Sequence, residues 1–101
     1  MNVVVSKHAV ERFLDWQRTT TLNVAPEKAE QVLARAARRG RVVSYLPGGA
    51  LEVEHRGLYL VVKKKRDGLA VITFNGDRAW RNWYRKQHLK AKYQAKVRAI
   101  V

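Results

Sequence analysis

Residues 26–56 read PEKAEQVLARAARRGRVVSYLPGGALEVEHR, and this stretch decides the fold class. As far as Gly40, apolar residues recur at i, i+3, i+4 and i+7, which predicts an amphipathic helix that ends at this glycine. Beyond it the hydrophobic period changes from 3.6 to 2, which predicts strands over residues 41–46 and 50–56 joined by a Pro-Gly-Gly turn. A helix followed directly by a hairpin is typical of a domain whose helices and strands are segregated.

The flanking sequence extends both patterns. Ser6 is a good N-cap for a helix that runs to about Arg18. Strands are predicted over residues 58–65 and 69–74, joined by an Asp-Gly hairpin signal, and a basic helix follows from about Arg78. We therefore expect an α+β fold, in which two N-terminal helices pack on a roughly four-stranded antiparallel meander and a basic C-terminal helix follows.

Composition suggests how the chain is divided. A chain of 101 residues is long enough for one small domain with a core and too short for two. We expect residues 1–76 to form the α+β core domain and residues 77–101 to form a basic aromatic C-terminal helical extension. Residues 3–5 fit either a short strand or an ordered lead-in to the first helix.

The charge of the chain points to an acidic partner. The net charge is +13, and residues 77–101 carry eight Lys or Arg against one Asp, interleaved with Trp and Tyr. Cations attract phosphates and aromatic rings offer faces for bases, so this composition favours nucleic acid, RNA rather than DNA. The expected nucleic-acid-binding residues are Arg56, Lys65, Arg78, Trp80, Arg81, Trp83, Tyr84, Arg85, Lys86 and Lys90.

Composition also excludes several classes of protein. Without cysteine the chain has neither disulfides nor thiolate zinc sites. No apolar run approaches the roughly 20 residues that cross a bilayer, and the N-terminus lacks the pattern of a signal peptide. Glu52 and Glu54 share a strand face without a third acid nearby, which disfavours magnesium-dependent nuclease chemistry. We expect a cytoplasmic protein with no metal, no cofactor and no membrane partner.

His8 and Arg12 are the first candidates for chemistry. At i, i+4 they lie side by side on the predicted first helix. An imidazole can accept and return a proton near neutral pH, and a guanidinium can hold a phosphate at two points. The alternative is that both residues belong to an ordinary solvated helix face.

The predicted sheet carries three further candidates. Alternation puts His55 on an apolar strand face, where it is either a site residue or a buried imidazole bonded to a neighbour. Lys63 belongs to a lysine run that either completes a basic site or only covers a wet surface. Thr73 and Asn75 are expected on the same side of the last strand as Val71, where they could bond a phosphate or a base edge. Thr73 also has the ordinary role of a strand-forming residue.

Groups of this kind can cut RNA without a metal. A base removes the proton of the 2′-hydroxyl, which attacks the adjacent phosphate. Cations then stabilise the extra charge on phosphorus, and an acid protonates the leaving 5′ oxygen. The candidate catalytic residues are His8, Arg12, His55, Lys63 and Thr73.

Two short motifs carry a resemblance to a known superfamily. The first predicted helix opens with SKHAVERF (residues 6–13), and the meander ends in VIT (residues 71–73). With this order of elements the chain resembles small toxin-type, metal-independent ribonuclease domains of the barnase, EndoU, colicin and RelE-like superfamily, which include families that begin with a His-Ala-x-x-Arg helix. The resemblance covers roughly residues 6–75.

The resemblance implies roles for three residues. His8 would transfer a proton, Arg12 would contact the phosphate, and Thr73 would be a sheet-borne contact in the active site. It does not show whether His55 or a lysine of the third predicted strand completes the site. The basic aromatic tail lies outside the shared pattern, which leaves room for a domain that kept the fold and lost the reaction.

Several functions are therefore compatible with the sequence. The leading hypothesis is an RNA-binding, metal-independent endoribonuclease of toxin or mobile-element effector type. The alternative is a non-catalytic nucleic-acid-binding regulator of phage or plasmid type on a ribonuclease-like fold. A basic surface of this kind could also meet an acidic protein, such as an inhibitor or antitoxin.

Overall fold

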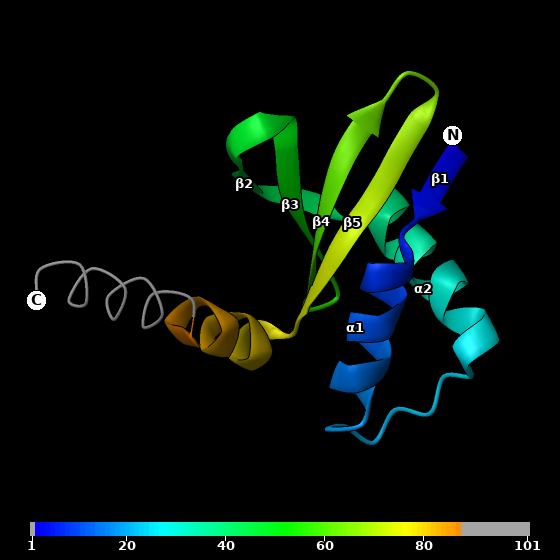
Figure 1. Ribbon diagram of the computed structural model, residues 1–101, viewed down its shortest axis with the longest axis vertical. Coiled ribbons are helices and arrows are strands. Elements are labelled where there is room, and N and C mark those ends of the chain that lie inside the picture. Colours follow the sequence, from blue (N-terminus) through cyan, green and yellow to red (C-terminus); the bar gives the residue numbers. More distant parts are fainter. Residues whose placement is uncertain (1, 88–101) are drawn as a thin grey trace, which may run out of the picture.

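The computed structural model describes residues 2–87, in which two helices lie against one sheet and residues 78–87 form a further helical stretch (Figure 1). The elements are β1 (Asn2–Val5), α1 (Lys7–Gln17), α2 (Pro26–Arg39), β2 (Arg41–Tyr45), β3 (Ala50–His55), β4 (Leu58–Lys65) and β5 (Gly68–Gly76). A short 3₁₀ turn, Pro47–Gly49, joins β2 to β3. The predicted α+β fold with a C-terminal helix is confirmed.

The sheet contains five strands in the order β1-β5-β4-β3-β2. The strands β2 to β5 form the predicted antiparallel meander, and β1 pairs parallel with β5, with Val5 opposite Val71. The sheet thus has one strand more than the expected four. This strand is held in place because Ser6, directly after it, donates its N–H to the Val71 carbonyl at 3.0 Å and its hydroxyl to the Ile72 carbonyl at 2.8 Å.

Aromatic packing fixes α1 on the sheet. The helix begins where predicted because the Ser6 hydroxyl accepts a hydrogen bond from the N–H of Ala9 at 3.0 Å. Phe13 and Trp16 turn inward and meet Phe74 of β5, with ring centroids 5.3 and 5.4 Å from that of Phe74. Edge-on aromatic pairs contribute about 0.5–1.5 kcal/mol each beyond the area they bury. The core therefore centres on the contact between α1 and β5.

α2 follows the periodicity of the sequence closely. Pro26 is its first residue, Leu33 and Ala36 are buried against the sheet, and the N–H of Gly40 donates to the Ala36 carbonyl at 2.8 Å. The apolar face of this helix completes the core, so its polar side chains are left on the opposite side and along its edges. One of these edges borders the cavity described below.

Two bulges in β5 change the predicted orientations of Thr73 and Asn75. Val61 pairs with Thr73 whereas Val62 pairs with Val71, so Ile72 is an extra residue, and Asn75 is another because Leu60 pairs with Phe74 and Tyr59 with Gly76. One extra residue reverses the alternation of side chains beyond it. Thr73 therefore faces away from the helices, and Asn75 reaches Glu52 on the same outer face, so the prediction that both share a side with Val71 is wrong. No glycine marks the Ile72 bulge in the sequence, so the alternation pattern gave no sign of it.

Candidate nucleic-acid interface

The two candidates on α1 differ in their surroundings. His8 is exposed, whereas Arg12 is half-buried with its guanidinium carbon 3.8 Å from the centroid of the Tyr84 ring. The Nε and Nη2 atoms of Arg12 are buried and find no hydrogen-bond partner among residues 2–87. The edge of the guanidinium that would hold a phosphate at two points is therefore shielded from solvent while Tyr84 is in this position.

The sheet places His55 and Lys63 far apart. His55 pairs with Leu58 at one end of the β3–β4 hairpin, and Lys63 pairs with Ala50 near the other end. Five residues of extended chain separate the two positions, a distance of about 16 Å. Alternation puts His55 on the face covered by the helices and Lys63 on the outer face, where Thr73 also lies with its hydroxyl buried and unbonded among the described residues. The five predicted catalytic residues are therefore not gathered around one point.

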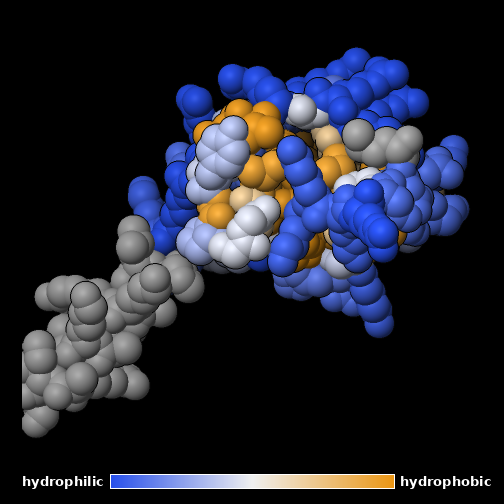
Figure 2. Space-filling view, turned by 90° about the horizontal axis from the view of Figure 1, so that it is seen from above, coloured by the Kyte–Doolittle hydropathy of each residue, from blue (hydrophilic) through white to orange (hydrophobic). Residues whose placement is uncertain are grey.

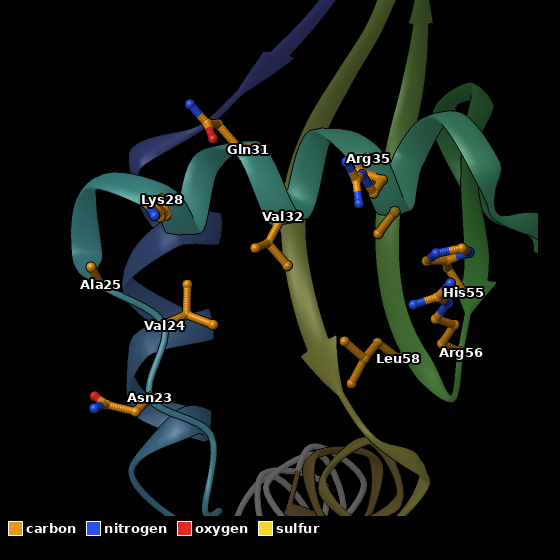
Figure 3. Close-up of a pocket in the computed structure, with 11 residues that line it drawn as sticks. Asn23, Val24, Ala25, Lys28, Gln31, Val32, Arg35, His55, Arg56 and Leu58 are labelled. Carbon is orange, nitrogen blue, oxygen red and sulfur yellow. The ribbon is translucent and has the colours of Figure 1, made fainter.

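A cavity of about 640 Å³ lies between α2, the loop before it and the β3–β4 turn (Figure 3). Its lining consists of an apolar centre flanked by cationic, imidazole and amide side chains. The lining residues are Asn23, Val24, Ala25, Lys28, Gln31, Val32, Arg35, Ala36, His55, Arg56 and Leu58. His55 thus lies in a hollow with three cations, not in an apolar core.

The sequence patterns identified only part of this cavity. His55 and Arg56 were predicted as site residues, but Lys28 and Arg35, which lie about 20 to 28 residues earlier in the chain, were not. One signal was present: Lys28 and Arg35 are seven residues apart, so they lie on the same side of the predicted helix. The sequence could not show that the β3–β4 turn closes over that side of the helix.

The electrostatics of the cavity are one-sided. Lys28, Arg35 and Arg56 line it, and among the residues that the structure describes no carboxylate does. Glu54 precedes His55, but alternation turns it to the other strand face, where it accepts a hydrogen bond from the Arg41 Nε at 3.3 Å. Positive charges gathered without an acid repel one another, and an anion relieves that repulsion.

Arg56 is held in an unusual backbone conformation. It has a φ of 51°, the one positive φ among the described non-glycine residues, and Gly57 after it has a φ of 82°. Two-residue hairpin turns with both φ values positive prefer Asn-Gly, and an ordinary side chain in this region costs about 1–2 kcal/mol. Figure 3 shows His55 and Arg56 together at the end of the hairpin, across the cavity from Asn23 and Val24. The turn thus carries an arginine to the cavity at a cost in backbone strain.

A second polar cluster, the Glu52 network, lies on the outer face of β3. Glu52 is 3 % exposed, and both of its carboxylate oxygens accept from Arg81, with the Arg81 Nε at 3.0 Å from each. The Asn75 side-chain amide donates to it at 3.1 Å, and Arg85 Nη2 lies 3.7 Å away. The Arg81 guanidinium also stacks over Tyr59, 4.5 Å from its ring centroid. This network joins residues 78–87 to the sheet.

The protonation of this network follows from its contacts. Burial by itself raises the pKa of Glu52, but hydrogen bonds from Arg81 and Asn75 and the charges of Arg81 and Arg85 outweigh burial and hold that pKa below its ordinary value of 4.5. The hydrogen bond to Glu52 raises the pKa of Arg81. Both groups are charged at neutral pH, so Arg81 is neutralised within the protein. Sequence analysis placed Glu52 on the polar face of its strand and did not identify this role.

The aromatic residues of the C-terminal helix are only partly available to a ligand. The Asp77 carboxylate accepts from the N–H of Trp80 at 2.9 Å and so caps the helix. Trp80 packs against the core, Tyr84 lies under Arg12, and Trp83 remains 52 % exposed. Of the ten predicted nucleic-acid-binding residues, Trp80, Arg81 and Tyr84 are half-buried by contacts within the protein. Arg85 and Trp83 are exposed but also contact Glu52 and the rings of Trp80 and Tyr84, respectively. Arg56, Lys65, Arg78 and Lys86 are exposed, and Lys90 lies outside the described residues.

Comparisons with protein-family models, with curated proteins and with solved structures find no match for this chain. The resemblance to metal-independent ribonucleases therefore still rests on the two short motifs alone. Within residues 2–87 no group of three His, Asp or Glu side chains lies close enough to hold a metal ion. No helix in the same range is long and apolar enough to cross a bilayer.

Proposed function

We propose that the protein binds single-stranded RNA through its phosphates, with the basic cavity as the central contact. The observation that carries the proposal is the meeting of Lys28, Arg35 and Arg56 around one hollow without an acid. Cations that release counterions from a phosphate backbone supply most of the affinity of proteins for nucleic acids. The exposed Trp83 adds a flat ring on which a base can stack.

Exposed cations beyond the cavity support a polyanionic partner over a small anion. Arg38 and Arg39 are exposed in the last turn of α2, and residues 63–66, at the opposite end of the sheet from the cavity, are four exposed cations in a row. Figure 2 views the molecule from the β4–β5 end and shows hydrophilic residues around an apolar centre there. A phosphate chain can cross several such patches, whereas one small anion can occupy only one.

The shape of the cavity supports a single strand over a duplex. A hollow of about 640 Å³ accepts small groups, and stacked base pairs cannot enter it. Proteins that recognise RNA sequences mostly take unstacked bases of single-stranded loops and ends. RNA and DNA strands differ in the 2′-hydroxyl, so a matched pair of oligonucleotides with the same sequence separates these two ligands.

The test is a binding titration of labelled single-stranded RNA by fluorescence anisotropy at several salt concentrations. Arg35→Ala removes a cavity cation from an exposed helix position, where alanine is the best helix former. We expect about tenfold weaker binding, and a dependence of log affinity on log salt that is smaller by about one unit. The matched control is Arg18→Ala, because Arg18 is exposed and already pairs with Asp15 at 3.4 Å. Equal loss of affinity in both variants would contradict the proposal.

A second candidate function is RNA cleavage without a metal, and the position of His55 favours it. An imidazole in a cavity with three cations supplies a proton-transfer group beside groups that bind phosphate. In the reaction the imidazole takes the proton of the 2′-hydroxyl, and the oxygen forms a bond to the adjacent phosphorus. The bond from phosphorus to the 5′ oxygen breaks, and that oxygen takes a proton from water, which leaves a cyclic phosphate and a free 5′-hydroxyl.

Cleavage of RNA in the presence of EDTA tests this second function. We expect His55→Ala to lose cleavage and His8→Ala to retain it if the cavity is the reaction site. The reverse result would move the reaction to α1, where the His-Ala-x-x-Arg motif lies. If the folded protein binds RNA and cuts none of a mixed-sequence set, the cleavage function is excluded and the binding function stands.

A further inference from the structure

The basic cavity combines cationic and apolar side chains. Figure 3 shows His55 and Arg56 at the hairpin end, Arg35 on the neighbouring part of α2, and Lys28 at the opposite end. Between them lie Val24, Val32 and Leu58, whose side chains form an apolar middle. A site that bound only a phosphate would need the cations and would gain nothing from the apolar middle.

A nucleotide offers the two matching parts. Its phosphate is anionic, and its base has two flat apolar faces. We propose that the cavity holds one unstacked nucleotide, with its phosphate at Arg35 and Arg56 and its base against Val32 and Leu58.

The proposal rests on the proposed RNA-binding function and adds a recognition element to it. The cavity volume of about 640 Å³ lies within the range of about 300–1,000 Å³ found for small-molecule sites, which is enough for one nucleotide. An apolar surface against the base face strengthens binding whatever the base. The protein would thus favour RNA strands that present a base out of the stack.

The strained turn fits this role. Arg56 is carried on a positive φ, and such conformations cluster where ligands are held. The turn residue after it is glycine, with no heavy atom within 4 Å of the position that a Cβ would take. At this turn the cavity is therefore lined by the Arg56 side chain, whereas Gly57 makes no close packing contact. This is the position from which a guanidinium meets a phosphate that enters beside His55.

The test uses the full chain labelled with ¹⁵N, and four 5′-mononucleotides as probes in NMR titrations. Ribose 5-phosphate and inorganic phosphate serve as probes that lack the base. We expect at least one mononucleotide to bind about tenfold more tightly than ribose 5-phosphate, because only the mononucleotide covers the apolar middle. Its largest shift changes should fall on residues of α2 and the β3–β4 turn. Equal affinity for the mononucleotides and ribose 5-phosphate would overturn the proposal.

Two variants locate the binding. Arg35→Ala should weaken every phosphate-bearing probe about tenfold. Arg18→Ala, the control of the RNA titrations, should leave the affinity for every probe unchanged. Nucleotide binding that Arg35→Ala does not alter would place the nucleotide elsewhere and overturn the proposal.

Parallel RNA titrations separate this proposal from the one on which it rests. If RNA binding depends on Arg35 while no mononucleotide binds better than phosphate, the nucleotide site is wrong and RNA binding stands. If RNA binding itself does not depend on Arg35, both proposals fail. Retention of the wild-type spectrum by each variant shows that a loss is not due to unfolding.

Discussion

Two groups of arginines lie on opposite faces of the same strand and have opposite electrostatic surroundings. On the outer face of β3, Arg81 and Arg85 approach the buried carboxylate of Glu52. On the helix-covered face, Arg35 and Arg56 line a cavity in which no described carboxylate takes part. The residue type is the same in both places, and the presence of one acid makes the first group a structural contact and leaves the second free for a ligand.

This difference changes how the charge of the chain is interpreted. The sequence predicted that five cations of the basic tail, Arg78, Arg81, Arg85, Lys86 and Lys90, bind nucleic acid. Among residues 78–87 the most buried cation is Arg81, and its charge is satisfied by Glu52. The cavity draws its cations instead from α2 and a turn, which the sequence did not mark as basic segments. The location of the acids, rather than the density of the cations, therefore identifies the candidate interface.

The largest effect is expected when the acid of the Glu52 network is removed. Glu52→Gln leaves Arg81 buried and charged and turns an amide group toward it, so we expect a loss of about 3–5 kcal/mol of unfolding free energy. Urea denaturation at neutral pH measures this loss. Glu54→Gln is the matched control on the same strand, because the Arg41 partner of Glu54 is 76 % exposed and such pairs contribute about 0–1 kcal/mol. Similar losses in the two variants would show that Glu52 is not a structural anchor.

A somewhat smaller effect is expected from Gly76→Ala, which disturbs the docking of residues 78–87 without touching a charge. Gly76 has a φ of 74°, and a Cβ there would lie 2.7 Å from ring atoms of Trp80. Strain and displacement of the ring together should cost about 2–4 kcal/mol and shift the tryptophan fluorescence.

Gly57→Ala provides the control for the backbone strain. Gly57 has a φ of 82° with nothing within 4 Å of the added Cβ, so only the strain of about 1–2 kcal/mol remains. An equal loss of stability in the two alanine variants would mean that the contact between Gly76 and Trp80 does not hold the helix on the sheet.

Acid should weaken the Glu52 network. The pKa of Glu52 is lower in the folded protein than its ordinary value of 4.5 in the unfolded protein. The network therefore contributes its full stability above about pH 4.5 and loses it as the pH falls through the pKa of the folded protein. The effect is smaller than that of Glu52→Gln, since a protonated carboxyl still offers Arg81 an acceptor. The difference in melting temperature between wild type and Glu52→Gln should become smaller as the pH falls. A difference that stays constant with pH would show that protonation of Glu52 does not weaken the network.

The fold was largely predictable because its signals are local. The Ser6 cap, the spacing of apolar residues in α2 and the Pro-Gly-Gly turn each act within a few residues, and each predicted its element. β1 was ambiguous because only its pairing with β5 makes it a strand. The Ile72 bulge was missed for a similar reason, since it exists only relative to the register of β4.

The candidate site was less predictable because it depends on which charges meet. His55 and Arg56 were identified from their residue types, but their neighbours Lys28 and Arg35 come from a helix packed against the hairpin. Conversely, Arg81, which was predicted to bind nucleic acid, forms hydrogen bonds with an acid 29 positions earlier in the chain. Local periodicity can predict neither the cations that join the cavity nor the pairing of Arg81 with an acid, because both depend on the tertiary arrangement.

The smallest effect on stability, and the sharpest separation of structure from function, is expected from Arg56→Asn. Asparagine tolerates a positive φ far better than arginine, so the variant should gain about 0.5–1 kcal/mol of unfolding free energy while RNA binding weakens about tenfold. Arg56→Lys keeps both the backbone strain and the positive charge. It should therefore change the unfolding free energy and the affinity for RNA less than Arg56→Asn does. Denaturation and anisotropy on the same samples measure the pair of effects. If Arg56→Asn gained stability without losing affinity for RNA, Arg56 would have no role in binding. The two faces of β3 would then differ only in how their arginines pack, and not in whether the arginines bind a ligand.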